Sequence, residues 1–222
     1  MAQGQFDFAR PPAHEAFADG AFLLRGFALR DAPQLLAAID AVVAAAPLRH
    51  VETPGGKRMS VAMSNCGACG WVSDRRGYRY EACDPTSGKP WPPMPAVIRS
   101  LAVRAAASAG WAGFAPDACL VNRYEPGARM TRHQDRDEAD FAWPIVSVSL
   151  GLPATFVFGG LTRSGPVQRL QLEHGDVVVF GGAARLCFHG VLPVREAVHP
   201  AVGRARWNLT FRVAGLRSAA SG

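Results

Sequence analysis

The sequence contains no apolar stretch that is long enough to cross a membrane. The longest such stretch, residues 35–47, is interrupted by Asp40 and is shorter than the ~20 residues that a transmembrane helix requires. The first residues also lack the basic and apolar regions of a secretory signal peptide. These absences predict a cytoplasmic protein without a membrane partner.

The sequence also lacks a disulfide framework. Its five cysteines are an odd number in a chain of 222 residues, which is untypical of disulfide-stapled secreted domains and favours a reducing compartment. Cys66 and Cys69 have the spacing of half a zinc or redox motif. Because no second pair and no thioredoxin-like pattern accompanies them, we interpret both as thiols without a chemical role.

No internal repeat, low-complexity tract or nucleotide-binding glycine fingerprint is present. Hydrophobic residues make up 49% of the chain, which is enough for a substantial core, and the length predicts a single domain over residues 1–222. The 23 glycines and 17 prolines favour short strands and turns over long helices. A formal net charge of +6 favours an anionic partner such as nucleic acid.

The first half of the chain carries the helical signals. Asp31 is a preferred N-cap residue, and apolar residues at helical spacing follow it as far as Pro47. A second helix is predicted from about residue 95 to Gly110. Turn residues and aromatics between these helices predict hairpins and loops. We therefore predict an N-terminal extension over residues 1–114.

The second half carries strand signals. The predicted strands cover residues 118–124, 144–150, 154–158, 169–172, 177–180, 188–192 and 205–213. Many short strands without helices between them indicate a sandwich or barrel, and a jelly roll, or double-stranded β-helix, fits best. The predicted fold class is mainly β with flanking helices (α+β), with the jelly-roll core over residues 115–213.

Three potential metal ligands lie within this β region. His133 and Asp135 are two residues apart, so both can point to one face of a strand, and His189 follows 54 residues later on another predicted strand. Two imidazoles and one carboxylate form the facial triad of non-haem Fe(II) oxygenases. The alternatives are a zinc site, or a surface triplet beside an unrelated core histidine.

The predicted strand at residues 206–212 has two different faces. One face is apolar, and four polar side chains share the other: Arg206, Asn208, Thr210 and Arg212. A polar face inside a barrel must meet a polar partner, and a dicarboxylate such as 2-oxoglutarate suits both the arginines and an iron site. Asn122 and Tyr124 repeat this spacing. An exposed sheet face is the alternative, and a zinc site does not explain the arginines.

Several segments carry the patterns of one known family. They include NRYEPG at 122–127, HQDRDE at 133–138 and RWNLTFR at 206–212, with further likeness at 53–56, 59–63, 144–151 and 173–179. Together they resemble the AlkB family of Fe(II)- and 2-oxoglutarate-dependent nucleic-acid dealkylases. The resemblance extends from about residue 20 to residue 215 and is strongest to the bacterial members.

The resemblance implies a metal site and a co-substrate site. Fe(II) would be bound by the catalytic triad His133, Asp135 and His189. The co-substrates would be O2 and 2-oxoglutarate, the latter held by Asn122, Tyr124, Arg206, Asn208 and Arg212.

The resemblance also implies a substrate lid at about residues 48–92. Trp71 would stack on a flipped base opposite His133, Tyr78 would contact the nucleic-acid backbone, and Asp137 would approach the exocyclic amino group of the base. The remaining groove residues would be Thr53, Met63 and Arg163. Three arginines lie beside these aromatics: Arg75, Arg76 and Arg79. Our hypothesis is that they contact phosphates, and a solvated surface is the alternative.

The implied function is oxidative dealkylation of 1-methyladenine and 3-methylcytosine, which reverses alkylation damage and releases formaldehyde, succinate and CO2. The implied partner of this monomer is alkylated DNA, single-stranded by preference, with RNA as a further candidate. Two alternatives stay open. One is an Fe(II)/2-oxoglutarate oxygenase acting on another class of substrate, and the other is a non-catalytic basic module that binds nucleic acid.

Overall fold

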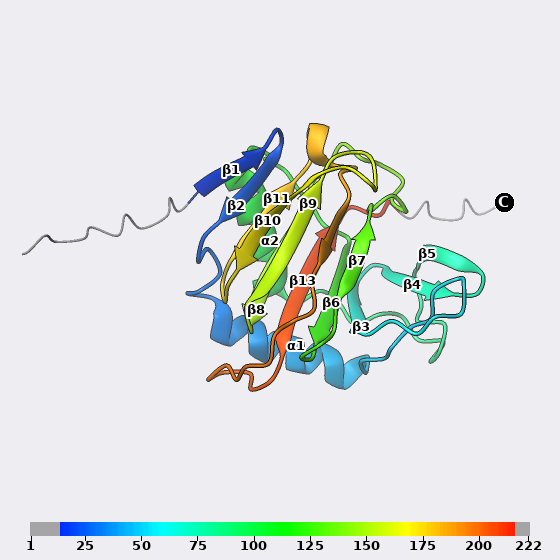
Figure 1. Cartoon of the computed structure of the whole chain (residues 1–222). Coiled ribbons are helices and arrows are strands. Elements are labelled where there is room, and N and C mark those ends of the chain that lie inside the picture. Colours follow the sequence, from blue (N-terminus) through cyan, green and yellow to red (C-terminus); the bar gives the residue numbers. More distant parts are fainter. Residues whose placement is uncertain (1–13, 216–222) are drawn as a thin grey trace, which may run out of the picture.

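The computed structural model describes residues 14–215, whose strands form two facing antiparallel sheets (Figure 1). The larger sheet has the strand order β1-β2-β11-β8-β13-β6-β3. Its strands are β1 (His14–Ala18), β2 (Ala21–Leu24), β3 (Ala62–Gly67), β6 (Ala118–Tyr124), β8 (Ile145–Gly151), β11 (Val177–Phe180) and β13 (Arg206–Arg212). The smaller sheet has the order β10-β9-β12-β7 and consists of β7 (Met130–His133), β9 (Ala154–Gly159), β10 (Val167–Leu172) and β12 (His189–Val191). The predicted mainly-β jelly-roll fold is confirmed.

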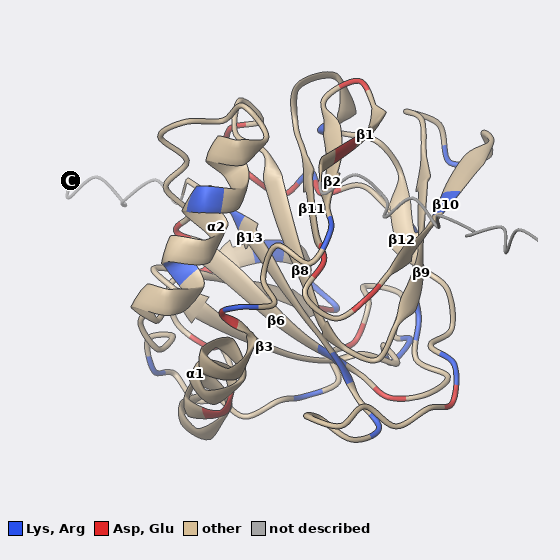
Figure 2. Ribbon diagram, turned by 90° about the vertical axis from the view of Figure 1, so that its left-hand side faces the viewer, with Lys and Arg blue, Asp and Glu red and all other residues tan. Residues whose placement is uncertain are grey.

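Two helices cover the outer face of the larger sheet (Figure 2). They are α1 (Ala32–Ala45) and α2 (Ala96–Ser108), close to their predicted positions. Asp31 precedes α1 as expected, but its carboxylate accepts a hydrogen bond from Arg104 of α2 instead of capping the helix. Gly110 follows α2 with a φ of +99°, a conformation that glycine adopts without strain. Neither helix of this part of the chain is long and apolar enough to span a membrane.

The alternating side chains of the larger sheet divide the interior into two layers. Leu209 and Phe211 of β13 pack in the core between the sheet and the helices. A second core lies between the sheets, where Ile145 and Phe180 of the larger sheet meet Phe156 of the smaller one. The polar residues of β13 point into this second layer, so the alternation of the strand places the candidate site between the two sheets.

The segment before residue 115 contributes more strands than its sequence indicates. β1 and β2 extend one edge of the larger sheet, and β3 forms the other edge beside β6. Beyond β3, strands β4 (Gly70–Asp74) and β5 (Gly77–Glu81) form a separate hairpin, seen at the right of Figure 1. The prediction of a hairpin in this region is correct, whereas β1, β2 and β3 were not predicted.

The cysteines are free thiols that differ in their exposure. Cys66, Cys69 and Cys119 are fully buried, Cys187 is buried, and Cys83 is exposed. Burial and the neighbouring Asp117 raise the pKa of Cys69 to about 12. Both thiols of the C-x-x-C pair are therefore inaccessible, and the raised pKa of Cys69 makes that thiol a poor nucleophile.

We expect Cys83 to be the single rapidly reacting thiol of the native protein. Treatment with a maleimide at pH 8 should label this residue first, because the other thiols are shielded by packing and burial. Mass spectrometry of the labelled peptides measures the order of reaction, and the same protein in denaturant, where all five thiols should react, is the control. Early labelling of Cys66 or Cys69 would contradict the buried arrangement.

Candidate metal and co-substrate site

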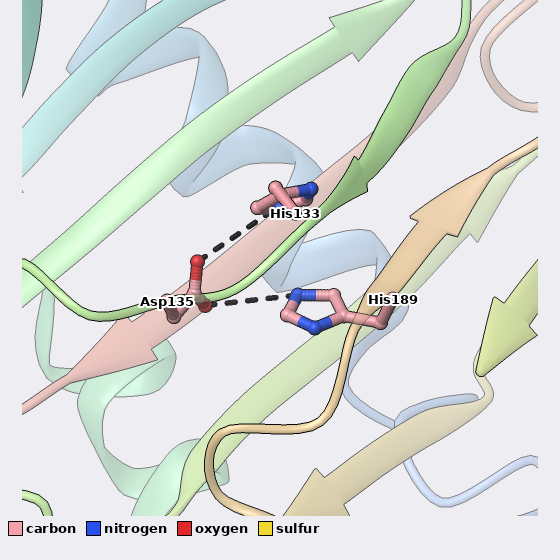
Figure 3. Close-up of side chains that lie close together, drawn as sticks. All are labelled: His133, Asp135 and His189. Carbon is pink, nitrogen blue, oxygen red and sulfur yellow. Dashed lines mark ion pairs between the residues drawn. The ribbon is translucent and has the colours of Figure 1, made fainter. Parts of the chain in front are cut away.

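The three potential metal ligands meet in the layer between the sheets. His133 ends β7 and lies opposite His189 at the start of β12, with their ring centroids 4.5 Å apart. Asp135 follows β7, and its carboxylate oxygens lie 3.6 Å from Nε2 of His133 and 3.9 Å from Nε2 of His189 (Figure 3). The ligand atoms all lie within 4.8 Å of one another, close to the separation of ligand atoms that share one ion.

A close approach of two backbones creates this arrangement. β7 contains a register shift, and it passes directly over Gly190, the residue after His189. A Cβ atom at Gly190 would lie 2.6 Å from the carbonyl oxygen of Met130 and 3.1 Å from the nitrogen of Arg132. Only glycine allows this contact, which holds His133 beside His189.

Both imidazoles are oriented for metal binding. Nδ1 of His133 lies 2.9 Å from the carbonyl oxygen of Thr131, and Nδ1 of His189 lies 3.0 Å from that of Cys187. Because a carbonyl oxygen only accepts, each Nδ1 carries the proton and each Nε2 presents a lone pair. Burial and the neighbouring His133 lower the pKa of His189 to about 4, so this ligand is neutral at physiological pH.

The carboxylate ligand is held by an arginine. Nε and NH2 of Arg212 donate to the same oxygen of Asp135 over 3.1 and 2.8 Å. Burial opposes ionisation of Asp135, but attraction by the Arg212 guanidinium outweighs it and lowers the pKa of the carboxyl. Asp135 is therefore an anion with one oxygen fixed by Arg212 and the other directed toward His133.

A cavity beside the triad is lined by the predicted co-substrate residues. Among the residues around it are Asn122, Tyr124, Arg206, Asn208 and Arg212. Asn122 donates to Asn208, whose own amide donates to Ser147, so a hydrogen-bond chain crosses three strands of the larger sheet. The cavity is thus polar on the side of the larger sheet and lies directly against the three potential ligands.

Arg206 is the most unusual residue of this cavity. It is 1% exposed, donates to Ser149 through NH2, and lies 4.8 Å from the ring centre of Tyr124. Nε and NH1 of Arg206 and Oδ1 of Asn122 are buried without a hydrogen-bond partner. Leaving a buried cation unpaired is costly, so the two guanidinium nitrogens require an anionic ligand, and a carboxylate matches the guanidinium fork. The cavity therefore fits 2-oxoglutarate, and the adjoining triad fits Fe(II).

A second cavity of about 380 Å³ adjoins the first. All six predicted substrate residues line it: Thr53, Met63, Trp71, Tyr78, Asp137 and Arg163. The two cavities share five residues: Leu120, Met130, His133, Asp135 and Arg212. A ligand in the second cavity would therefore lie next to the potential metal ligands.

The aromatic wall of the second cavity is held in place by the hairpin and by Asp137. Trp71 of β4 stacks on Tyr78 of β5, with a centroid distance of 5.4 Å and an interplanar angle of 16°. The indole Nε1 of Trp71 donates to Asp137 over 2.8 Å. The wall is therefore flat and polar at one edge, and Tyr78 remains 45% exposed at its rim.

Two of the three arginines predicted to contact phosphates have carboxylate partners within the hairpin. Arg79 donates to Asp74 and Glu81, and Arg76 donates to Asp74. The side chain of Arg75 is 84% exposed and lies at the limit of ion pairing with a glutamate. Much of the positive charge expected at this surface is thus neutralised locally.

Four polar residues of the site were missed by the sequence analysis. Ser147 and Ser149 occupy alternate positions of β8 and contact Asn208 and Arg206, a spacing that the sequence does display. Glu138 and Arg185 form a buried ion pair behind the metal ligands. Their separation along the chain gives no sequence signal for that pairing.

Comparison with known proteins agrees with this geometry. The family model of the 2OG-Fe(II) oxygenase superfamily matches residues 20–212. The alpha-ketoglutarate-dependent dioxygenase AlkB of Salmonella typhimurium is 55% identical over 91% of this chain and 94% of its own length. The chain belongs to the AlkB family of Fe(II)- and 2-oxoglutarate-dependent oxygenases.

Other members of the family share parts of the chain or the fold. The DNA N(6)-methyladenine demethylase ALKBH1C of Arabidopsis thaliana is 39% identical over 44% of this chain and 24% of its own length. The solved structure of OsALKBH1 superimposes with a TM-score of 0.78 at 26% identity, covering 90% of this chain and 99% of the other. Membership of this family makes the chain an Fe(II)- and 2-oxoglutarate-dependent dioxygenase, with O2 as its second co-substrate.

Gly190→Ala should damage the metal site. The added Cβ must displace β7 and with it His133, so we expect the affinity for Mn(II) to fall by about 10- to 100-fold, as for other changes that misplace a ligand. Calorimetric titration of the metal-free protein measures the change. Gly160→Ala is the matched control, because a Cβ at that glycine meets no atom within 4 Å. Equal metal affinity of the two variants would refute the argument from close approach.

Proposed function

We propose that this dioxygenase removes alkyl groups from 1-methyladenine and 3-methylcytosine in DNA, and thereby reverses alkylation damage. The main support is the cavity of about 380 Å³, which has an aromatic wall and adjoins the candidate metal ligands. The demethylase activity named for the Arabidopsis relative and the net positive charge of this chain also favour nucleic acid.

His133, Asp135 and His189 would hold Fe(II) as a facial triad. With O2 and 2-oxoglutarate, the bound metal supplies the oxidising power that hydroxylates the N-alkyl carbon. The two histidines would bind as neutral imidazoles, and Asp135 would contribute one negative charge. The site with bound Fe(II) would therefore have a net positive charge, which favours an anionic co-substrate.

Arg206 would pair with a carboxylate of 2-oxoglutarate through Nε and NH1, the two atoms that lack a partner. Asn122, Tyr124 and Asn208 would line the same cavity, and Arg212 would lie between this cavity and the metal ligands. The two unpartnered nitrogens of Arg206 would then be satisfied by the co-substrate.

The second cavity would receive a base that has left its stack, because the alkyl group of a stacked base is out of reach. Trp71 would stack on the base opposite His133, and a cationic methylated ring would be attracted to the indole face. Asp137 uses one oxygen for Trp71, so the other can accept from the exocyclic amino group. Thr53, Met63, Tyr78 and Arg163 would complete the groove, with Tyr78 at the nucleic-acid backbone.

Each turnover would consume one O2 and one 2-oxoglutarate. One oxygen atom of O2 would be incorporated into succinate as CO2 leaves. The other would be inserted into a C–H bond of the N-methyl group, which becomes a hydroxymethyl group. The hydroxymethyl group would then separate from the ring nitrogen as formaldehyde, which restores the base. The buried cavity would keep bulk water away from the metal during these steps.

We further infer a single domain over residues 1–222, with a lid at about residues 48–92 on a core at residues 115–213. Alkylated single-stranded DNA would be the preferred partner and RNA a second one, and the enzyme would act as a monomer. A cytoplasmic location is supported by the five free thiols.

The function can be tested with the metal-free protein loaded anaerobically with Fe(II) and 2-oxoglutarate. After addition of air and an oligonucleotide containing 3-methylcytosine, we expect base repair and succinate in equal amounts, and neither product with His133→Ala. Mass spectrometry follows both products. Formation of succinate without repair would indicate that the enzyme acts on a substrate other than this methylated base. The absence of both products would support a non-catalytic binding module.

Arg206→Met should weaken binding of 2-oxoglutarate by roughly 30-fold or more, because it removes the cation from a buried charge pair. A ligand stabilises the folded protein more the higher its affinity for it. We therefore expect 2-oxoglutarate to raise the melting temperature of the wild type much more than that of Arg206→Met. Arg204→Met is the control, since Arg204 lies on the surface beside Glu196. Similar KM values for both variants would exclude Arg206 from the co-substrate site.

A further inference from the structure

A buried charged cluster lies behind the metal ligands. Glu138 is its centre: its Oε2 accepts from Arg185 over 3.0 Å, and its Oε1 lies 3.3 Å from Nε of Arg212. Arg212 in turn holds Asp135, and Arg185 donates to the backbone carbonyl of Asp135 over 2.7 Å. The same Oε1 accepts from the hydroxyl of Tyr80 over 2.6 Å.

The cluster contains two carboxylates and two guanidinium groups, and each of these side chains is at most 7% exposed. Such a group of charges is costly to bury, and it is tolerated where all its members are paired. Each of the four has a partner of opposite charge, so the cluster is neutral before a metal binds. Removing one charge leaves another without compensation.

Tyr80 connects this cluster to the wall of the second cavity. It belongs to β5 and lies directly opposite Trp71 of β4 in the hairpin register. Trp71 also contacts Asp137, the neighbour of Glu138. Two side-chain contacts therefore tie the hairpin to the segment that contains the carboxylate ligand.

We propose that Glu138 is a positioning residue that fixes Arg212 and through it the metal-ligating carboxylate of Asp135, and that Tyr80 couples the seating of the hairpin to the same network. This inference rests on the proposed metal and lid roles. Glu138 Oε1 lies 3.3 Å from the same Nε of Arg212 that donates to Asp135, so the charge of Glu138 restrains the guanidinium that orients Asp135.

Coupling through one network is reciprocal. If the seated hairpin favours the arrangement of Asp135 that binds metal, then bound metal must favour the seated hairpin to the same extent. The hydroxyl of Tyr80 is the atom that carries this coupling to Glu138. The charge of Glu138 and the hydroxyl of Tyr80 can be removed separately.

Glu138→Gln removes the charge and keeps an oxygen that can accept from Tyr80. The cluster then gains a net positive charge, so the affinity of the metal-free protein for Mn(II) should fall about tenfold, while KM for the anionic 2-oxoglutarate at saturating metal should not rise. Titration calorimetry and steady-state kinetics measure the two quantities. Glu125→Gln, which alters an exposed ion pair with Arg123, is the control. A lower melting temperature with unaltered Mn(II) affinity would show a merely structural role and overturn the proposal.

Tyr80→Phe keeps every charge of the cluster, so it tests the coupling in a protein that should fold. In the wild type, Mn(II) with 2-oxoglutarate should slow amide hydrogen exchange of residues 70–81 several-fold, and in Tyr80→Phe this protection should be largely lost. Ser73→Ala is the matched control, because it removes a hydroxyl contact of the hairpin with the carbonyl of Glu52, outside the cluster. In Ser73→Ala, residues 70–81 should exchange faster both with and without Mn(II) and 2-oxoglutarate. The ratio of the two exchange rates should be the same as in the wild type.

Protection that persists in Tyr80→Phe, or that is absent from the wild type, would refute the coupling. Metal titration and hydrogen exchange need no nucleic acid, so either result is independent of whether the enzyme repairs 3-methylcytosine. Conversely, if hydrogen exchange shows the expected coupling but 3-methylcytosine is not repaired, only the proposed substrate is refuted.

Discussion

The site depends on one close approach between two backbones. β7 can lie against β12 only because Gly190 has no side chain, and this contact places His133 opposite His189. The position of Asp135 follows, since it is two residues beyond the end of β7 and is held from the other side by Arg212 of β13. The two histidines thus converge through the irregular pairing of β7 with β12, whereas Asp135 comes from the loop that follows β7.

A second constraint is the alternation of β13, which separates two kinds of interior. Its odd-numbered residues, such as Leu209 and Phe211, fill the core beneath the helices. Its even-numbered residues face the opposite sheet, where Arg206 remains partly unpaired. The apolar layer stabilises the strand strongly enough to hold a buried cation in a position where it lacks a full set of partners. The unfavourable free energy of burying Arg206 is therefore compensated by the apolar core before any co-substrate binds.

Sequence patterns indicated the features that depend on short-range periodicity. The two-residue spacing of His133 and Asp135 and the alternation of residues 206–212 predicted which side chains share a face, and the structure brings these side chains together. Strands β1 and β2, at one side of the larger sheet, are only five and four residues long and escaped prediction. The ion pair of Glu138 with Arg185 joins residues 47 positions apart, and no local pattern specifies which buried charges will meet.

The hairpin β4–β5 shows how the substrate side depends on the metal side. A two-stranded hairpin alone is marginally stable in water, so its position must come from contacts with the rest of the molecule. The side-chain amide of Asn65 in β3 donates through Nδ2 to the carbonyl oxygen of Trp71 and accepts through Oδ1 from its backbone N–H, which fixes the base of the hairpin. Two further contacts end at Asp137 and Glu138, immediately after the carboxylate ligand. A change that widens the second cavity by moving the hairpin must therefore also disturb the segment that carries Asp135, and the two cavities cannot be altered independently.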